Sequence, residues 1–235
     1  VILVENLQSK PYIDLTISVL EKFDINIVNE NYQHFFIAGK QNYNACTLEI
    51  EGDWSGTSCL LAAAATGGSI TVENLNPQSK QADVAMLDVL RLCGANVMVE
   101  ENKITVEKNH LNAFEFDATD CPDLFPAIVA LCANCKGTSI IKGALRLQNK
   151  ETSRAEILKH EFAKLNVKIE LKNDIMYIAG SNICSATVDT HGDHRIAMAL
   201  AAASVCADGN LIIENAECVS KSYPDFWTDF FKIMK

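Results

Sequence analysis

A charged pentapeptide, Lys150-Glu-Thr-Ser-Arg154, is the segment whose residue types best suit chemistry on an anion. It lies where a loop is predicted to lead into a helix, and a helix start favours anions through its free N–H groups and macrodipole. Lys150 and Arg154 would strengthen a phosphate or carboxylate site there, and Glu151 beside them is an acid/base candidate. The alternative is an ordinary helix start that Thr152 caps, with a solvated charged first turn.

Aspartates stand at the predicted starts of two further helices. Asp193-His-Arg195 opens one, Asp123 after Pro122 opens the other, and Lys221 precedes the sequence Tyr-Pro-Asp. A single aspartate at a helix start is usually only a cap. The positions gain weight from a repeat that makes them equivalent.

Two cysteines and two histidines have spacings that resemble metal sites. Cys132 and Cys135 lie inside an apolar helical segment with no second pair, which favours a core helix over a zinc or redox site. His191 and His194 flank Asp193 at a spacing that permits metal ligation, but no third ligand motif accompanies them. We therefore predict no metal site.

The candidate residues recur at an interval of about 70 residues. The string Ile2-Leu-Val-Glu-Asn-Leu7 returns as Ile70-Thr-Val-Glu-Asn-Leu75. Two further series keep step with it: the lysines are Lys10, Lys80, Lys150 and Lys221, and the aspartates are Asp53, Asp123 and Asp193. Repeats packed around a common axis would bring such loops to one rim.

The elements that position these residues form a βαβαββ unit. Each aspartate precedes a first helix, predicted over 54–66, 124–135 and 194–207, and a glycine turn then leads to a strand, over 69–75, 138–142 and 210–214. A lysine loop precedes each second helix, predicted over 12–23, 81–93, 152–165 and 223–234. Closing hairpins are predicted for 97–100 with 103–106 and for 167–171 with 176–179.

The composition fits a globular protein that works on small molecules. The chain has 235 residues, and its 49% hydrophobic content is ample for buried cores. A net charge of −10 argues against nucleic-acid binding, which needs a basic face. No apolar run is long enough for a membrane span, and nine cysteines, an odd number, suit free thiols in the cytosol.

The chain ends indicate a fragment of a longer protein. The sequence opens with Val1 on a strand whose preceding first helix is absent, and it stops after a second helix without a closing hairpin. We expect an upstream part to complete the protein.

Five motifs together resemble the enolpyruvylshikimate-phosphate synthase family, which comprises the 3-phosphoshikimate 1-carboxyvinyltransferases. The resemblance covers essentially the whole chain. The motifs, in order, are Ser9-Lys-Pro-Tyr-Ile-Asp-Leu-Thr16, Pro122-Asp123, Lys150-Glu-Thr-x-Arg154, Asp193-His-Arg195 and Lys221-x-Tyr-Pro-Asp225.

The resemblance implies an α/β fold of two domains, each made of three βαβαββ units in an inside-out α/β barrel. Residues 1–51 would finish the upper, split domain. Residues 52–235 would form most of the lower domain as three repeats, the last of them incomplete. The missing N-terminal part would complete the cleft between the domains, so we expect this fragment alone to be inactive.

The resemblance also implies a reaction. The family transfers the carboxyvinyl group of phosphoenolpyruvate to the 5-hydroxyl of shikimate 3-phosphate and releases phosphate, in aromatic amino-acid biosynthesis. It implies no metal or organic cofactor and an intact protein that is a cytoplasmic monomer without nucleic-acid or membrane partners. The matching residues are Asp123 and Glu151 for catalysis, Ser9, Tyr12, Asp123 and Lys150 for shikimate 3-phosphate, and Arg154, His194, Arg195 and Lys221 for phosphoenolpyruvate.

Two positions depart from the family pattern, and two alternatives remain open. Arg146 stands where some members have asparagine, and Ser153 replaces a common aspartate. One alternative is an enolpyruvyltransferase acting on UDP-N-acetylglucosamine, which the Ser-Lys-Pro-Tyr and Lys-Glu-Thr-x-Arg strings oppose. The other is a non-catalytic repeat module that binds an anion.

Overall fold

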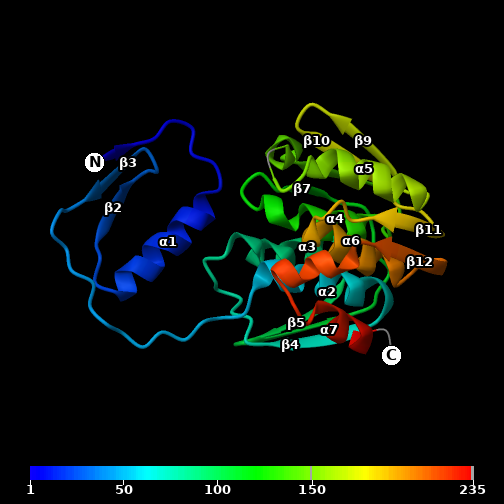
Figure 1. Ribbon diagram of the computed structural model, residues 1–235, viewed down its shortest axis with the longest axis horizontal. Helices are drawn as coiled ribbons and strands as arrows, with labels where there is room; N and C mark the ends of the chain where they lie inside the picture. The colour runs from blue at the N-terminus through cyan, green and yellow to red at the C-terminus, as the bar shows by residue number, and fades with distance from the viewer. Residues whose placement is uncertain (149, 234–235) are drawn as a thin grey trace.

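The computed structural model describes residues 1–148 and 150–233 as an α/β protein. Figure 1 shows a small N-terminal part, in blue, beside a larger part that holds the remaining elements. The connection between them, residues 38–53, contains no helix or strand.

The N-terminal part has one helix and a three-stranded antiparallel sheet. Its elements are β1 (Ile2–Leu3), α1 (Lys10–Lys22), β2 (Ile27–Glu30) and β3 (His34–Ile37), with the sheet order β1-β3-β2. None of the 13 residues of α1 is buried, although the helix is amphipathic. The sheet likewise leaves Ile2, Leu3, Val28 and Phe36 exposed, while Phe35 is buried.

The same connection of strand, helix and hairpin occurs twice more, which confirms the predicted repeat. One copy has the sheet order β4-β6-β5 and the other has β8-β10-β9, so the last strand always lies in the middle. The first copy comprises β4 (Ser69–Glu73), η1 (Ala82–Ala85), α3 (Met86–Cys93), β5 (Asn96–Glu100) and β6 (Lys103–Glu107). The second comprises β8 (Thr138–Lys142), η3 (Ala144–Leu147), α5 (Arg154–Lys164), β9 (Lys168–Lys172) and β10 (Ile175–Ala179).

The last unit pairs β11 (Cys184–Asp189) with β12 (Asp208–Glu214) in parallel. Two helical segments, η4 (Ala216–Lys221) and α7 (Phe226–Ile233), follow it. A corresponding parallel strand, β7 (Glu115–Asp117), lies beside β8. The residue pattern did not locate β7, which has three residues, or β11, which has six, because each is defined by its parallel pairing with a later strand.

Three first helices lie at the centre of the larger part and pack against one another. They are α2 (Trp54–Gly67), α4 (Phe125–Cys132) after the short η2 (Pro122–Leu124), and α6 (His194–Ser204). All three are buried along most of their length, and their alanines allow close approach. Sheets outside and helices inside agree with the predicted fold.

The element ends differ from prediction by a few residues. The helix expected over 124–135 ends at Cys132, and the one expected over 194–207 ends at Ser204. The helix expected over 81–93 begins as the 3-10 turn η1. Such ends depend on local hydrogen bonds that periodicity does not specify.

The cysteines behave as core residues or free thiols. All nine lie within the described residues and none forms a disulfide. Cys132 and Cys135 are buried, as predicted for a core segment, and burial raises the pKa of Cys132 to about 12. Among the described helices, none combines the length and the apolar character needed to cross a membrane.

The packing of Gly180 against the end of α4 generates a prediction. A Cβ at Gly180 would lie 1.7 Å from the carbonyl oxygen of Cys135, which is backbone and has little freedom to move. We expect Gly180→Ala to lower the free energy of unfolding by about 3 kcal/mol.

Urea denaturation followed by circular dichroism would measure this loss. Gly39→Ala is the matched control, because nothing lies within 4 Å of a Cβ at that position. Equal stabilities for the two variants would contradict the close approach.

Candidate active site at three helix starts

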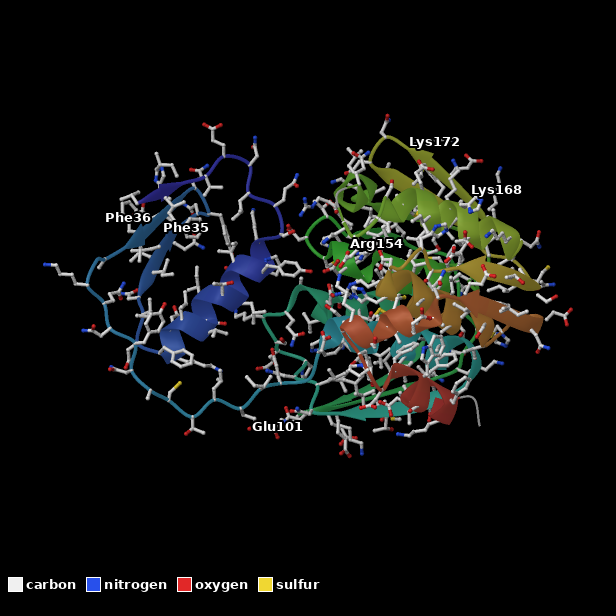
Figure 2. All side chains as sticks on the ribbon, viewed as in Figure 1. Phe35, Phe36, Glu101, Arg154, Lys168 and Lys172 are labelled. Carbon is white, nitrogen blue, oxygen red and sulfur yellow. The ribbon has the colours of Figure 1, made fainter. Side chains whose placement is uncertain are left out.

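A buried arginine joins three segments of the larger part. Arg154 is the first residue of α5, and its side chain is 0% exposed. Figure 2 shows it inside the larger part, whereas Lys168 and Lys172 extend from the outer surface. An unpaired charge at such a position would be very unfavourable, so its partners define the site.

Three carboxylates surround the Arg154 guanidinium. Its Nε donates to Asp193 Oδ2 at 2.9 Å, Nη1 to Asp123 Oδ1 at 3.1 Å, and Nη2 to Glu151 Oε2 at 2.6 Å. Nη2 also donates to Asp193 Oδ1 at 3.3 Å. Four of the five N–H donors of a guanidinium are therefore occupied.

Three further cations, of which Lys221 is exposed, pair with Asp123 and Glu151. Lys150 Nζ lies 3.1 Å from Asp123 Oδ1, and Arg195 Nη2 lies 3.6 Å from Asp123 Oδ2. Lys221 Nζ lies 3.2 Å from Glu151 Oε1, and its side chain is 60% exposed. The structure thus brings the four predicted cations together, although the chain as a whole is acidic.

The repeated aspartates have diverged in role. Asp53 caps α2 by accepting from the Ser55 N–H, and Asp193 caps α6 by accepting from the Arg195 N–H, both at 2.9 Å. Asp123 lies within the 3-10 turn η2, whose N-cap is Cys121. Because it caps no helix, its carboxylate is available to the cations.

The alternative interpretation of the charged pentapeptide, a cap by Thr152, is wrong. Ser153 occupies the N-cap position of α5, and its side chain makes no capping hydrogen bond within the described residues. The Thr152 hydroxyl instead donates to Asp193 Oδ2 at 3.3 Å. The start of α5 therefore donates a hydrogen bond to the cluster of carboxylates instead of being capped by Thr152.

Both candidate acid/base groups are held in the ionised form. Burial pushes the pKa of Asp123 upward, but Arg195, Lys150 and Arg154 together hold it below its ordinary value. Burial also opposes ionisation of Glu151, and its own backbone N–H, Arg154 and Lys221 overcome this and lower its pKa. Anions bound to the same cations would reduce this effect and raise both pKa values.

The N-terminal part reaches the site through α1. The Tyr12 hydroxyl donates to Asp123 Oδ2 at 3.4 Å, and burial raises the pKa of Tyr12, so it remains a neutral donor. The Ser9 N–H donates to Asp120 Oδ1 at 2.9 Å, and Ser9 Oγ accepts from Arg146 Nη2 at 2.7 Å. Arg146 therefore stands beside the predicted residues.

His191 and His194, on either side of Asp193, have different neighbours. His194 is buried, and its Nδ1 has no hydrogen-bond partner among the described residues. Burial, followed by the charge of Arg195, lowers its pKa. His191 Nε2 instead lies 3.0 Å from Glu161 Oε1. The spacing of the two histidines therefore does not bring their ring nitrogens to a common partner.

Asp83 is a buried acid near the site that the sequence analysis missed. It accepts from the Ser55 hydroxyl, and its Oδ1 has no partner among the described residues. Burial raises its pKa to about 6, although Ser55 and Arg195 act in the opposite direction. The signal was its place three residues after Lys80, which matches that of Ser153 after Lys150.

Sequence comparisons place the chain among proteins of one description. The family model for EPSP synthase (3-phosphoshikimate 1-carboxyvinyltransferase) matches residues 1–230. A 3-phosphoshikimate 1-carboxyvinyltransferase from Methanocella arvoryzae is 43% identical over 236 residues, which cover 99% of this chain and 56% of the relative. One from Clostridium novyi is 37% identical and is covered to 54%. The chain spans about half the length of the curated relatives it matches.

Solved structures share the fold. An EPSP synthase from Acinetobacter baumannii has a TM-score of 0.78 at 20% identity, covering 91% of this chain and 52% of that protein. An enolpyruvyl transferase from Streptomyces tendae has a TM-score of 0.71 at 16% identity, covering 98% of this chain and 54% of that protein. Both likenesses extend over about half of the longer proteins.

Removing the central guanidinium generates a prediction. Arg154→Met should lower the free energy of unfolding by about 3–5 kcal/mol, because the buried Asp193 and its neighbours would lose their counter-charge. Lys221→Met is the matched control and should cost below about 1 kcal/mol, since that lysine is exposed. Urea denaturation would measure both, and similar losses would contradict a central role for Arg154.

A second prediction uses the raised pKa of Asp83. When folding raises the pKa of an acid, the protein loses stability as the pH rises from the unfolded pKa through the folded pKa of that acid. Asp83→Asn should therefore gain stability over the wild type between about pH 4 and pH 7, by at most about 3 kcal/mol.

Thermal unfolding as a function of pH would measure this gain. Asp88→Asn, an exposed acid in α3 that pairs with Arg91, is the matched control. Parallel curves for Asp83→Asn and wild type would contradict the raised pKa of Asp83.

Proposed function

The chain belongs to the EPSP synthase (3-phosphoshikimate 1-carboxyvinyltransferase) family, and we propose that it supplies one wall of that family's active site. The complete protein would transfer the carboxyvinyl group of phosphoenolpyruvate to the 5-hydroxyl of shikimate 3-phosphate and release phosphate, in aromatic amino-acid biosynthesis. The observation that carries the proposal is the convergence of four cations on Asp123 and Glu151.

Asp123 and Glu151 suit the two proton transfers. In the addition step the 5-hydroxyl oxygen attacks C2 of phosphoenolpyruvate, loses its proton, and C3 gains one. In the elimination step the C2–O bond to phosphate breaks and C3 loses a proton, which restores the vinyl group. Asp123 is ionised beside the N-terminal part and would accept the hydroxyl proton. Glu151, on the Lys221 side, would serve the carbon centre.

The cations divide between the two substrates. We assign Ser9, Tyr12, Asp123 and Lys150 to shikimate 3-phosphate, because this group lies where α1 meets η2. We assign His194, Arg195, Lys221 and Arg154 to phosphoenolpyruvate. Lys221 is exposed, and Arg195, which is 16% exposed, lies 3.6 Å from Asp123, so the two can offer charge to a phosphate and a carboxylate. Arg154 positions the carboxylates and would meet the donor only after exchanging one of them.

The domain organisation follows from the same proposal. Residues 1–51 would be the end of the upper domain, and residues 52–235 most of the lower domain. The exposed apolar side chains of the N-terminal sheet support this, since they offer a surface for further units of the upper domain. The partner is then the upstream part of the same protein. The assembled protein would be a cytoplasmic monomer that needs no cofactor and binds no nucleic acid.

The one-wall proposal predicts that the 235-residue chain does not release phosphate from phosphoenolpyruvate and shikimate 3-phosphate. Catalysis by positioning needs both sides of the cleft. A chimera that places the N-terminal half of the Methanocella arvoryzae relative before this chain should be active. In that chimera, Asp123→Asn should reduce kcat by at least about 100-fold, because asparagine keeps the shape but removes the base.

The matched control for this loss is Asp53→Asn at the equivalent position of the first unit. Asparagine caps a helix as well as aspartate does, so this variant should keep most of the turnover. Phosphate release by the chain without its upstream half would contradict the one-wall proposal. Equal turnover of the two asparagine variants would remove Asp123 from its role as base.

A further inference from the structure

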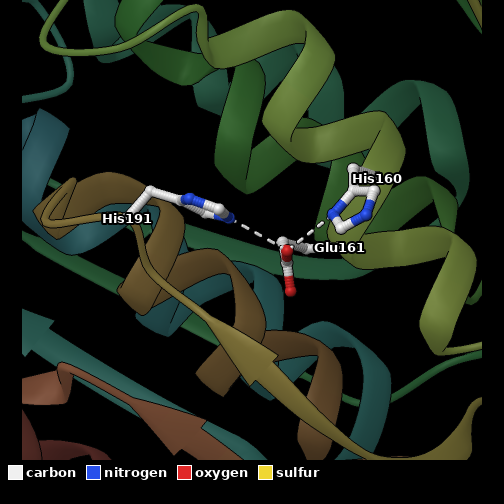
Figure 3. A group of neighbouring side chains, drawn as sticks. All are labelled: His160, Glu161 and His191. Atoms are coloured by element: carbon white, nitrogen blue, oxygen red, sulfur yellow. Dashed lines mark hydrogen bonds and ion pairs between the residues drawn. The ribbon is translucent and has the colours of Figure 1, made fainter.

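A second group of chemically active side chains lies on the same two elements, α5 and the loop before α6, that carry Arg154 and Asp193. His160 and Glu161 are on α5, and His191 is on the loop before α6 (Figure 3). Glu161 Oε1 lies 2.8 Å from His160 Nδ1 and 3.0 Å from His191 Nε2. We propose that these three side chains bind one divalent transition-metal ion of the zinc type.

The carboxylate of Glu161 is held in place for this purpose. The side chain is 0% exposed, and Oε2 accepts the backbone N–H of Asp189 at 2.8 Å. His191 has a left-handed backbone (φ 52), and its N–H donates to Asp189 Oδ1 at 2.8 Å. These contacts direct the His191 imidazole onto Glu161.

An ion can reach the group from solvent. The side chains of His160 and His191 are 68% and 38% exposed, whereas the carboxylate lies beneath them. The three ligand atoms lie within 4.8 Å of one another. Zinc bonds of about 2.0–2.1 Å in tetrahedral geometry separate ligand atoms by about 3.3 Å. Glu161 Oε1 is already within a few tenths of an ångström of that distance from each ring nitrogen, whereas the two rings would have to approach each other by up to about 1.5 Å, which their exposed side chains can do by rotating. Water would supply the fourth ligand.

The donor set selects the class of ion. Two imidazole nitrogens and one carboxylate oxygen are ligands that zinc uses in proteins. Magnesium and calcium prefer sites made entirely of oxygen, so they should bind here only weakly.

Lys164 is the internal competitor of the ion. Its ammonium lies 3.0 Å from Glu161 Oε1 and 2.8 Å from Oε2. A bound ion would take Oε1, and Lys164 would have to withdraw to Oε2 or to solvent. Removing the charge of Lys164 should therefore tighten metal binding. If the three side chains only form hydrogen bonds with one another, removing this charge would create no affinity for metal.

The site would fasten helix α5 to the loop that carries Asp193. The Asp193 N–H donates to the Thr190 carbonyl at 3.0 Å, and its carboxylate holds Arg154 at the start of α5. An ion at His160 and His191 would add a second link between the same two segments. No metal site was predicted from the sequence, because no third ligand motif accompanies His191 and His194; the contact of His191 is Glu161, 30 residues away in the chain.

The test is calorimetric titration of the 235-residue chain with zinc chloride. The four cysteines that are not buried, Cys46, Cys184, Cys206 and Cys218, should first be changed to serine to remove thiolate ligands. In this background, His160→Ala and His191→Ala should each weaken zinc binding by at least about tenfold. His110→Ala, an exposed histidine elsewhere, should leave it unchanged, and Lys164→Gln should tighten it by about threefold or more.

Visible absorption of bound cobalt(II) would identify the ligands. Cobalt(II) in a tetrahedral site of nitrogen and oxygen ligands absorbs visible light strongly, and this band should vanish in His191→Ala. Because both histidines are exposed, their alanine variants should fold, which circular dichroism would check. Zinc affinity equal in the serine background and in the His160→Ala, His191→Ala double variant would overturn the proposal. Loss of all zinc binding in the serine background itself would also overturn it.

Discussion

The burial of one guanidinium is the constraint on which the rest of this structure depends. A charge removed from water costs several kcal/mol unless nearly all of its donors are matched. Arg154 meets this requirement only if the starts of α5 and α6 and the turn η2 hold their present positions. The cluster therefore fixes the geometry between three segments, and Lys150 and Lys221 add their charge to carboxylates whose positions are already set.

The repeat explains how one residue can act on three segments. The first helices α2, α4 and α6 pack side by side, and the loops that begin them lie at equivalent positions of successive units. Duplication delivers an aspartate to each start, and divergence then assigns different tasks. Asp53 and Asp193 cap their helices, and Asp193 also binds Arg154, whereas Asp123 caps no helix and, among the described residues, pairs only with cations and Tyr12, because a proline and a 3-10 turn replace the regular helix start.

The repeat and the helices were predictable because period and residue type are local properties of a sequence. The grouping of Lys150, Arg154, Arg195 and Lys221 could be predicted from their equivalent positions. The burial of Arg154 could not, since arginine is usually exposed and its depth depends on partners 31 and 39 residues away. Asp83, β7 and β11 were missed for a similar reason, because each is defined by what packs or pairs against it.

The reactivity of the buried thiols reports how often the core of this molecule opens. Cys59 and Cys132 lie on the central helices α2 and α4, and Cys93 ends α3; burial raises the pKa of these thiols to about 12, 12 and 11. Only a thiolate reacts readily with alkylating reagents or peroxides. These thiols can therefore be modified only when the helices open transiently, and the rate of alkylation would measure the frequency of such openings. In a cell under oxidative stress, the same residues would be spared for as long as the core stays closed.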